Sequence, residues 1–175
     1  MTAPSHPAPA AAPRRAARPG GLFYPYLTPH GPLTIRADGD AITDVALGDV
    51  PFDGAKGPSE AAGRAATQIQ EYLAGKRRTF DLELAPRGSA FQKEVWRAVA
   101  RIPFGQTRTC AQIADALGNA GGFRAVGAAV RKNPLAILIP AHRVVDANGK
   151  PLGTGKSAEL KGALLRMERD IAASA

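Results

Sequence analysis

Short apolar stretches alternate with turn residues from position 22 to position 50. The stretches cover residues 22–24, 33–35 and 41–47, and they are separated by Pro-His-Gly-Pro at 29–32 and by Asp38-Gly39. Turn signals at such close spacing are typical of hairpins or of an antiparallel meander. We therefore predict a small antiparallel sheet near the N-terminus.

A helical pattern follows this predicted sheet. Ser59 can cap a helix that runs to about Leu73, with apolar residues on one face and Gly75 at its end. Residues 80–84 then alternate between apolar and polar, which predicts another strand. The segment 85–88, Ala-Pro-Arg-Gly, predicts the link to a second domain.

The second half of the chain reads as largely helical. Ser89 with Gln92, and Thr109 with Gln112, have the spacing of capping boxes ahead of apolar residues. Gly118 would end the second of these helices, a further helix is predicted over 123–132, and a last one over 158–171. Two helices joined in this way make a helix-turn-helix candidate, although many helical domains contain such a pair for packing alone.

The pattern predicts an α+β protein. We expect a small antiparallel-sheet N-terminal domain over residues 21–86, and a largely helical C-terminal domain with a winged-helix-like helix-turn-helix over 87–175. Residues 1–20 contain Pro, Ala and Arg with almost no large apolar side chain, so we expect a disordered basic tail.

An apolar run at 135–139 is the next informative stretch. It is long enough for a buried strand and too short for a membrane span, and Pro140 interrupts it. Ala141, His142 and Arg143 follow directly, which places an imidazole at the rim of a core element. A lone histidine there is either a hydrogen-bonded structural residue or a catalyst.

Composition narrows the possible chemistry. The single cysteine, Cys110, excludes an internal disulfide, and histidines at 6, 30 and 142 have no zinc-ligand spacing, so we expect no metal and no cofactor. No apolar run reaches about 18 residues and the N-terminus lacks a signal pattern. We therefore expect a soluble, cytoplasmic monomer without a membrane partner.

The net charge of +8 is unevenly distributed along the chain. Residues 21–85 hold six basic and nine acidic residues, whereas residues 86–175 hold fourteen basic and six acidic residues. A positive C-terminal half suits a polyanion such as nucleic acid. A basic surface without any partner is the alternative.

The segment 124–168 resembles the active-site region of the O6-alkylguanine-DNA alkyltransferases, also called methylated-DNA-protein-cysteine methyltransferases. The signature of this family is Pro-Cys-His-Arg-Val, and this chain reads Pro-Ala-His-Arg-Val at 140–144. The likeness covers roughly residues 22–171. It implies the family's two-domain fold and its function in DNA repair.

The resemblance assigns the nucleophile position to Ala141. In the family, the histidine after the cysteine links through water to a glutamate in the last helix, and the resulting thiolate attacks the alkyl carbon. This chain keeps His142, and it keeps Glu168 in the matching helix. Because an alanine methyl has no lone pair, self-alkylation at position 141 is chemically excluded.

The resemblance also assigns DNA-contacting residues. Arg124 matches the arginine finger that enters the minor groove and fills the gap left by an extruded base; a solvated helix arginine is the alternative. Gly127 would let the helix approach DNA closely, or it serves helix packing. Arg131 and Lys132 either meet phosphates or are surface charges.

Two further positions have structural assignments. Asn133, before Pro134, matches a family residue that ties the helix-turn-helix to the active-site strand, and an Asx turn would do the same in any fold. Arg143 either meets a phosphate or belongs to a buried hydrogen-bond set.

Two departures from the family change the predicted pocket. Cys110, after Thr109, stands where the family has a tyrosine that pushes on the target phosphate, and it is either a packed thiol or a substitute nucleophile. Thr154, followed by Gly155, stands where an aromatic residue walls the guanine pocket. We predict a guanine pocket whose residues are Pro140, Ala141, His142, Val144, Thr154 and Gly155.

Three functions remain open from the sequence. The first is an alkyltransferase-like protein that binds alkylated duplex DNA, flips the base without transferring the alkyl group, and hands the lesion to nucleotide-excision-repair proteins. The second is a methyltransferase with an inactivating Cys-to-Ala change. The third is a helix-turn-helix transcription regulator.

Overall fold

The computed structural model describes residues 20–175, so the predicted tail lies outside the described residues except for Gly20. The N-terminal part contains a four-stranded sheet in the order β3-β2-β1-β4. Strands β1 and β2 pair antiparallel, as do β2 and β3, which confirms the predicted meander; β4 pairs parallel with β1. The strands are β1 (Leu22–Thr28), β2 (Gly31–Asp38), β3 (Ala41–Leu47) and β4 (Ala55–Lys56).

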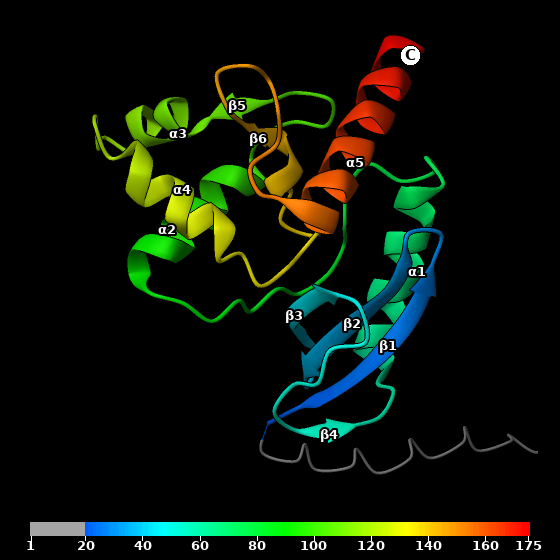
Figure 1. The fold of residues 1–175 in the computed structure, drawn as a ribbon. Coiled ribbons are helices and arrows are strands. Elements are labelled where there is room, and N and C mark those ends of the chain that lie inside the picture. Colours follow the sequence, from blue (N-terminus) through cyan, green and yellow to red (C-terminus); the bar gives the residue numbers. More distant parts are fainter. Residues whose placement is uncertain (1–19) are drawn as a thin grey trace, which may run out of the picture.

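Helix α1 (Glu60–Leu73) packs against β1, β2 and β3 and so covers one face of this sheet (Figure 1). The side chain of Ser59 accepts a hydrogen bond from the Ala62 amide at 3.1 Å, as expected for an N-cap. Gly75 adopts a left-handed backbone with φ of 74° directly after the last turn. The helix predicted from the sequence is confirmed at both ends.

The strand predicted over residues 80–84 is wrong. Only Leu84 makes an isolated parallel bridge, to Ile42. Two segments share the outer edge of β3, because Val45 bridges Leu135 a few residues further along. Neither segment can therefore pair over a strand's length, but together they attach the helical half to the sheet.

The strand predicted over residues 135–139 is also wrong. The backbone folds back within the run, with the Ile139 amide donating to the Leu135 carbonyl at 3.0 Å. Ile137 has φ of 71°, a left-handed conformation that is rare for a β-branched residue. Leu135, Ile137, Leu138 and Ile139 are all buried. The apolar run thus predicted burial correctly and secondary structure incorrectly.

The C-terminal half is largely helical, and the fold is α+β as predicted. Both predicted capping boxes are present, at Ser89 with Gln92 and at Thr109 with Gln112. The indole N–H of Trp96 donates to the Ala129 carbonyl at 2.8 Å and fixes α2 against α4. The helices are α2 (Ala90–Ala100), α3 (Cys110–Ala116), α4 (Phe123–Arg131) and α5 (Gly155–Ala173).

Helix α5 starts at Gly155, three residues earlier than predicted, because Thr154 takes an extended N-cap conformation. Before it, a 3-10 turn η1 (Ala141–Arg143) leads into β6 (Val144–Val145), which pairs parallel with β5 (Arg108–Thr109). Figure 1 shows the sheet and α1 at one end of the molecule and α2, α3 and α4 at the other. Among residues 20–175, no helix has both the length and the apolar character to cross a bilayer.

Candidate active site and nucleic-acid interface

A buried carboxylate, Glu168 on α5, organises the first candidate site. Its Oε1 lies 2.7 Å from His142 Nε2 and 2.8 Å from Arg143 Nη2, and it accepts a hydrogen bond from the Tyr72 hydroxyl at 2.6 Å. Its Oε2 accepts from Arg143 Nε at 2.9 Å and from the Gly105 amide at 3.0 Å. Helices α1 and α5, the turn η1 and the loop before β5 therefore meet at one charged group.

The protonation states follow from this geometry. Burial alone would raise the pKa of Glu168, but hydrogen bonds from His142 and Arg143 outweigh it and hold the pKa below its usual range. Burial lowers the pKa of His142, and burial with the neighbouring Glu168 raises that of Tyr72. The site therefore holds an ionised Glu168, with His142 and Tyr72 neutral.

The tautomer of His142 follows as well. A neutral imidazole that faces a carboxylate donates from the nearer nitrogen, here Nε2. Within residues 20–175 no hydrogen bond occupies the other nitrogen, Nδ1. The arrangement leaves a lone pair on Nδ1 that can accept a proton, which is the property of a general base.

The family resemblance predicted that water joins His142 to Glu168, and this prediction is wrong for the present chain. The two side chains are in direct contact because η1 packs against α5. Arg143 is buried as well, and its Nη1 donates to the Ile102 carbonyl at 2.6 Å. Of the two alternatives for Arg143, the structure therefore places it in the buried hydrogen-bond set.

A cavity of about 100 Å³ opens beside Ala141 and His142. Its lining also includes Arg131 at the end of α4, Asn133 shortly after that helix, and Leu160 and Lys161 from α5. The Lys161 ammonium donates to the Leu152 carbonyl at 2.9 Å. Burial, and then the nearby Arg131, lower the pKa of Lys161. This end of the cavity thus presents cations and hydrogen-bond donors to a ligand.

Four of the predicted pocket residues do not line this cavity. Pro140 is buried, and Val144 is fully buried in β6 next to Arg108. Thr154 and Gly155 are exposed at the start of α5. The first turn of α5 instead brings Ser157 to the cavity wall. A role for the four residues in a guanine pocket stays a prediction.

Asn133 holds the turn that carries the site. Its Oδ1 accepts from the Leu135 amide at 2.9 Å, and its Nδ2 donates to the Ile139 carbonyl at 3.1 Å. These bonds close the turn over residues 133–139, immediately before Ala141, and Asn133 itself lines the cavity. The side chain therefore connects the end of α4 to the segment that carries His142.

Tyr72 and Gly105 belong to the Glu168 cluster and were missed by sequence reasoning. Tyr72 lies 96 positions before Glu168 and joins it only through the packing of α1. Gly105 has φ of 78°, and a Cβ at this position would come within 2.9 Å of Ala172. A Pro-Phe-Gly sequence such as that at 103–105 is typical of a turn, but no local pattern shows what the Gly105 amide contacts.

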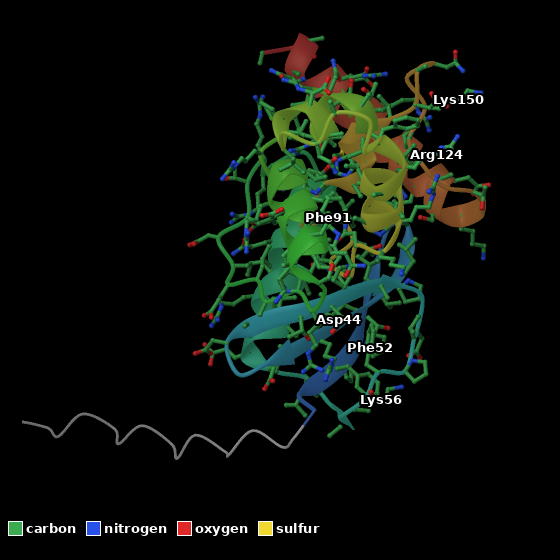
Figure 2. All side chains as sticks on the ribbon, turned by 90° about the vertical axis from the view of Figure 1, so that its left-hand side faces the viewer. Asp44, Phe52, Lys56, Phe91, Arg124 and Lys150 are labelled. Atoms are coloured by element: carbon green, nitrogen blue, oxygen red, sulfur yellow. The ribbon has the colours of Figure 1, made fainter. Side chains whose placement is uncertain are left out.

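A second hollow, of about 680 Å³, lies on the outer face of the helix-turn-helix. Thr109 at the N-cap of α3 and Cys110 at its start, together with Arg124, Gly127 and Arg131 from α4, line one side of it. The predicted DNA-contacting residues are thus brought together on one surface. In Figure 2, Arg124 points outward from α4, and Lys150 projects from the loop before α5, both away from the sheet.

Gly127 and Cys110 meet on this surface. A Cβ at Gly127 would lie 3.6 Å from Cys110 Sγ and from Arg131 Nη1, which is ordinary contact. Helix packing therefore does not require glycine here. Burial raises the pKa of Cys110 more than Arg131 lowers it, so its thiol stays protonated at neutral pH. This favours the packed-thiol interpretation over a substitute nucleophile.

Residues 20–175 contain no group of three or more His, Cys, Asp or Glu side chains that could hold a metal ion. The hollow is lined by the cations Arg124 and Arg131 and by the acid Asp146, and Lys132 is exposed just after α4. A surface with these cations and few acids is suited to a phosphate backbone.

Two family models match the chain. Residues 23–86 match the ribonuclease-like domain of 6-O-methylguanine DNA methyltransferase, and residues 90–170 match the DNA binding domain of the same family. The methylated-DNA–protein-cysteine methyltransferase of Mycobacterium bovis is 39% identical over 150 residues, which are 83% of this chain and 90% of that protein. Its counterpart from Methanosarcina mazei is 46% identical over 105 residues, 60% of this chain and 66% of that protein.

A solved structure agrees with these matches. The crystal structure of Mycobacterium tuberculosis OGT in complex with DNA has a TM-score of 0.79 and 38% identity, and the match covers 86% of this chain and 94% of that one. The fold, the site residues and the matches to both halves of the sequence therefore agree. The chain belongs to the DNA-binding 6-O-methylguanine DNA methyltransferase family.

Proposed function

We propose that this protein is an alkyltransferase-like DNA-repair protein. It would bind duplex DNA that carries O6-alkylguanine, flip the base through the minor groove, and leave the alkyl group in place. The observation that carries the proposal is Ala141, which lies at the family's nucleophile position and lines the cavity beside His142. Excision-repair proteins would then be the partners that act on the marked lesion.

The chemistry of transfer requires a sulfur at this position. The curated relatives are named for a protein cysteine that accepts the methyl group. The Ala141 methyl has neither a lone pair nor a proton to give up, so no bond to the alkyl carbon can form there. Cys110 lies in the other hollow, and its raised pKa keeps it as a thiol.

The volume of the cavity supports a role in recognising the alkyl group. Ligand pockets commonly measure about 300 to 1,000 Å³, so the space of about 100 Å³ beside Ala141 suits an alkyl substituent better than a whole base. The flipped guanine would lie above it, toward the loop that carries Thr154 and Gly155. Arg124 would fill the gap left in the duplex, since a flipped base costs a few kcal/mol of stacking and pairing.

The test is intact-mass spectrometry after incubation with an O6-methylguanine duplex. We expect the protein mass to stay unchanged while a gel-shift assay on the same sample shows a complex. A mass increase of one methyl group would contradict the proposal. The Mycobacterium bovis relative, treated identically, serves as the positive control for transfer.

A second function is favoured by the intact His142–Glu168 pair. A chain whose base machinery is complete could be a methyltransferase that has lost only its nucleophile. Ala141→Cys distinguishes the two: recovery of transfer at a rate close to the relative's supports the inactivated enzyme. The alkyltransferase-like proposal predicts little recovery, because Cys110 and Thr154 also replace side chains that the family uses for flipping and for the pocket.

A further inference from the structure

Phe123 is an exposed aromatic residue in an unusual place. It is the first residue of α4 and directly precedes Arg124, and 47% of its surface is exposed. Single exposed apolar residues are common and need no explanation by themselves. The position of Phe123 at the entry to the helix-turn-helix face sets it apart from Tyr24 and Leu27, which are exposed on β1.

Packing does not account for Phe123. It belongs neither to the buried core nor to the partly buried apolar residues that pack against that core. The ring instead lines the hollow of about 680 Å³, together with Cys110, Arg124 and Arg131. Val145, Ala147 and Leu152 make the rest of the lining largely apolar, and Asp146 is its one acid. The ring thus lies in an apolar hollow beside two arginines, on the surface that the proposed function presents to DNA.

Phe123 also interacts with the candidate finger. The guanidinium carbon of Arg124 lies 5.9 Å from the centre of the Phe123 ring, within the range of a cation–π contact. The two side chains therefore form a unit at the tip of α4 before any DNA arrives. Less rotamer freedom then remains to be lost when the arginine enters a groove.

We propose that Phe123 is a second wedge, a positioning residue that stacks on the base pair next to the gap filled by Arg124. The inference rests on the proposed function, because it requires an extruded base. Extrusion leaves a neighbouring base pair without its stacking partner, and proteins that open duplexes commonly insert apolar side chains at such steps. A phenyl ring can replace the lost stacking, whereas a guanidinium alone supplies charge and a smaller planar surface.

The test measures binding and base opening together. Duplexes carry one O6-methylguanine with 2-aminopurine as its neighbour, whose fluorescence rises when stacking is lost. We expect Phe123→Ala to weaken binding to this duplex about tenfold and to change the 2-aminopurine signal. The salt dependence of binding should stay as in the wild type, because no phosphate contact is removed.

Two further variants complete the design. Phe123→Trp retains a flat ring, so it should keep affinity near the wild-type value, and its indole emission should be quenched on binding. Leu27→Ala removes an even more exposed apolar side chain from β1 and should leave every signal unchanged. Circular dichroism of each variant verifies that the fold is kept.

The outcomes separate the wedge from the proposed function. If Phe123→Ala binds and opens the duplex like the wild type while Arg124→Ala does not, the wedge is wrong and base flipping stands. Unquenched Trp emission in the Phe123→Trp complex would also overturn the wedge. If neither Phe123→Ala nor Arg124→Ala alters the 2-aminopurine signal, base extrusion itself fails.

Discussion

At the scale of single residues, Glu168 shows how one buried carboxylate can organise a hydrogen-bond network. The carboxylate accepts hydrogen bonds from Tyr72, His142, Arg143 and Gly105, so it joins both halves of the chain. Removing one partner from such a buried charged set is costly, because the remaining groups lose their compensation. The network therefore stabilises the fold whether or not the protein transfers an alkyl group.

Tyr72→Phe tests this contribution to stability. The change removes the hydroxyl that donates to Glu168 at 2.6 Å and keeps the ring. We expect the free energy of unfolding in urea to fall by about 1.5 to 3 kcal/mol, the usual range for hydrogen bonds to charged groups. Tyr24→Phe, on the exposed edge of β1, is the matched control and should change stability by less than about 0.5 kcal/mol.

The same cluster predicts how stability depends on pH. His142 has a lower pKa folded than unfolded, mainly because of burial. Below about pH 6.5 the unfolded chain binds a proton at this position that the folded chain does not, so stability falls on acidification. The contribution of Glu168, whose folded pKa is also lowered, is present above its unfolded pKa and is lost at still lower pH.

His142→Gln should therefore flatten the loss of stability between pH 7 and pH 5. One proton accounts for at most about 1.4 kcal/mol per pH unit. Urea unfolding at several pH values measures the slope for both proteins. An unchanged slope in the variant would show that His142 does not carry the dependence.

Sequence reasoning found some site residues and not others. His142, Glu168 and Arg124 came from matching a known motif at fixed spacing, and the structure brings the first two into contact. Tyr72 could not be found in this way, because its partner is distant in sequence and only the docking of α1 unites them. Ser157 lines the cavity from the first turn of α5, which begins earlier than its composition suggested.

At the scale of elements, the sequence predicted helix ends reliably, because interactions between neighbouring residues determine them. Capping boxes at Ser89 and Thr109 and the glycine after α1 fixed helix ends through short-range hydrogen bonds. The two predicted strands at 80–84 and 135–139 failed, because an apolar run reports burial and does not by itself choose a backbone conformation. Both segments meet the same free edge of β3, so neither pairs with it over the length of a strand.

The N-cap of α3 provides a prediction for an element. Thr109→Ala removes the side chain that accepts from the Gln112 amide at 3.2 Å and should lower the free energy of unfolding by about 1 kcal/mol. Because α3 forms part of the proposed DNA surface, affinity for duplex DNA should fall as well. Ser89→Ala removes the equivalent cap of α2. It should cost similar stability and leave DNA affinity unchanged, and a parallel fall in affinity would contradict the assignment of α3.

At the scale of the whole molecule, charge separates the two halves. Residues 86–175 carry an excess of +8, whereas residues 21–85 carry an excess of −3. The excess lies in the half that contains the helix-turn-helix, so the field favours an approach of DNA toward α3 and α4. The sheet and α1 instead pack against the segment that carries His142.

This asymmetry predicts the salt dependence of DNA binding. Arg131→Ala should reduce the slope of log affinity against log salt by about one, because one exposed cation on the helix-turn-helix face is lost. Arg64→Ala removes an exposed cation on α1 that pairs with Glu60 and should leave the slope unchanged. Equal effects of the two variants would mean that DNA does not bind this face.

Competitive binding of two duplexes that differ only in a methyl group on one guanine O6 tests the central claim most directly. Fluorescence anisotropy with a labelled O6-methylguanine duplex gives the concentration of each competitor that displaces it. A protein that reads the lesion at Ala141 should require about tenfold more unmodified duplex than modified duplex. Equal displacement by the two duplexes would show that the protein binds DNA without recognising alkylated guanine.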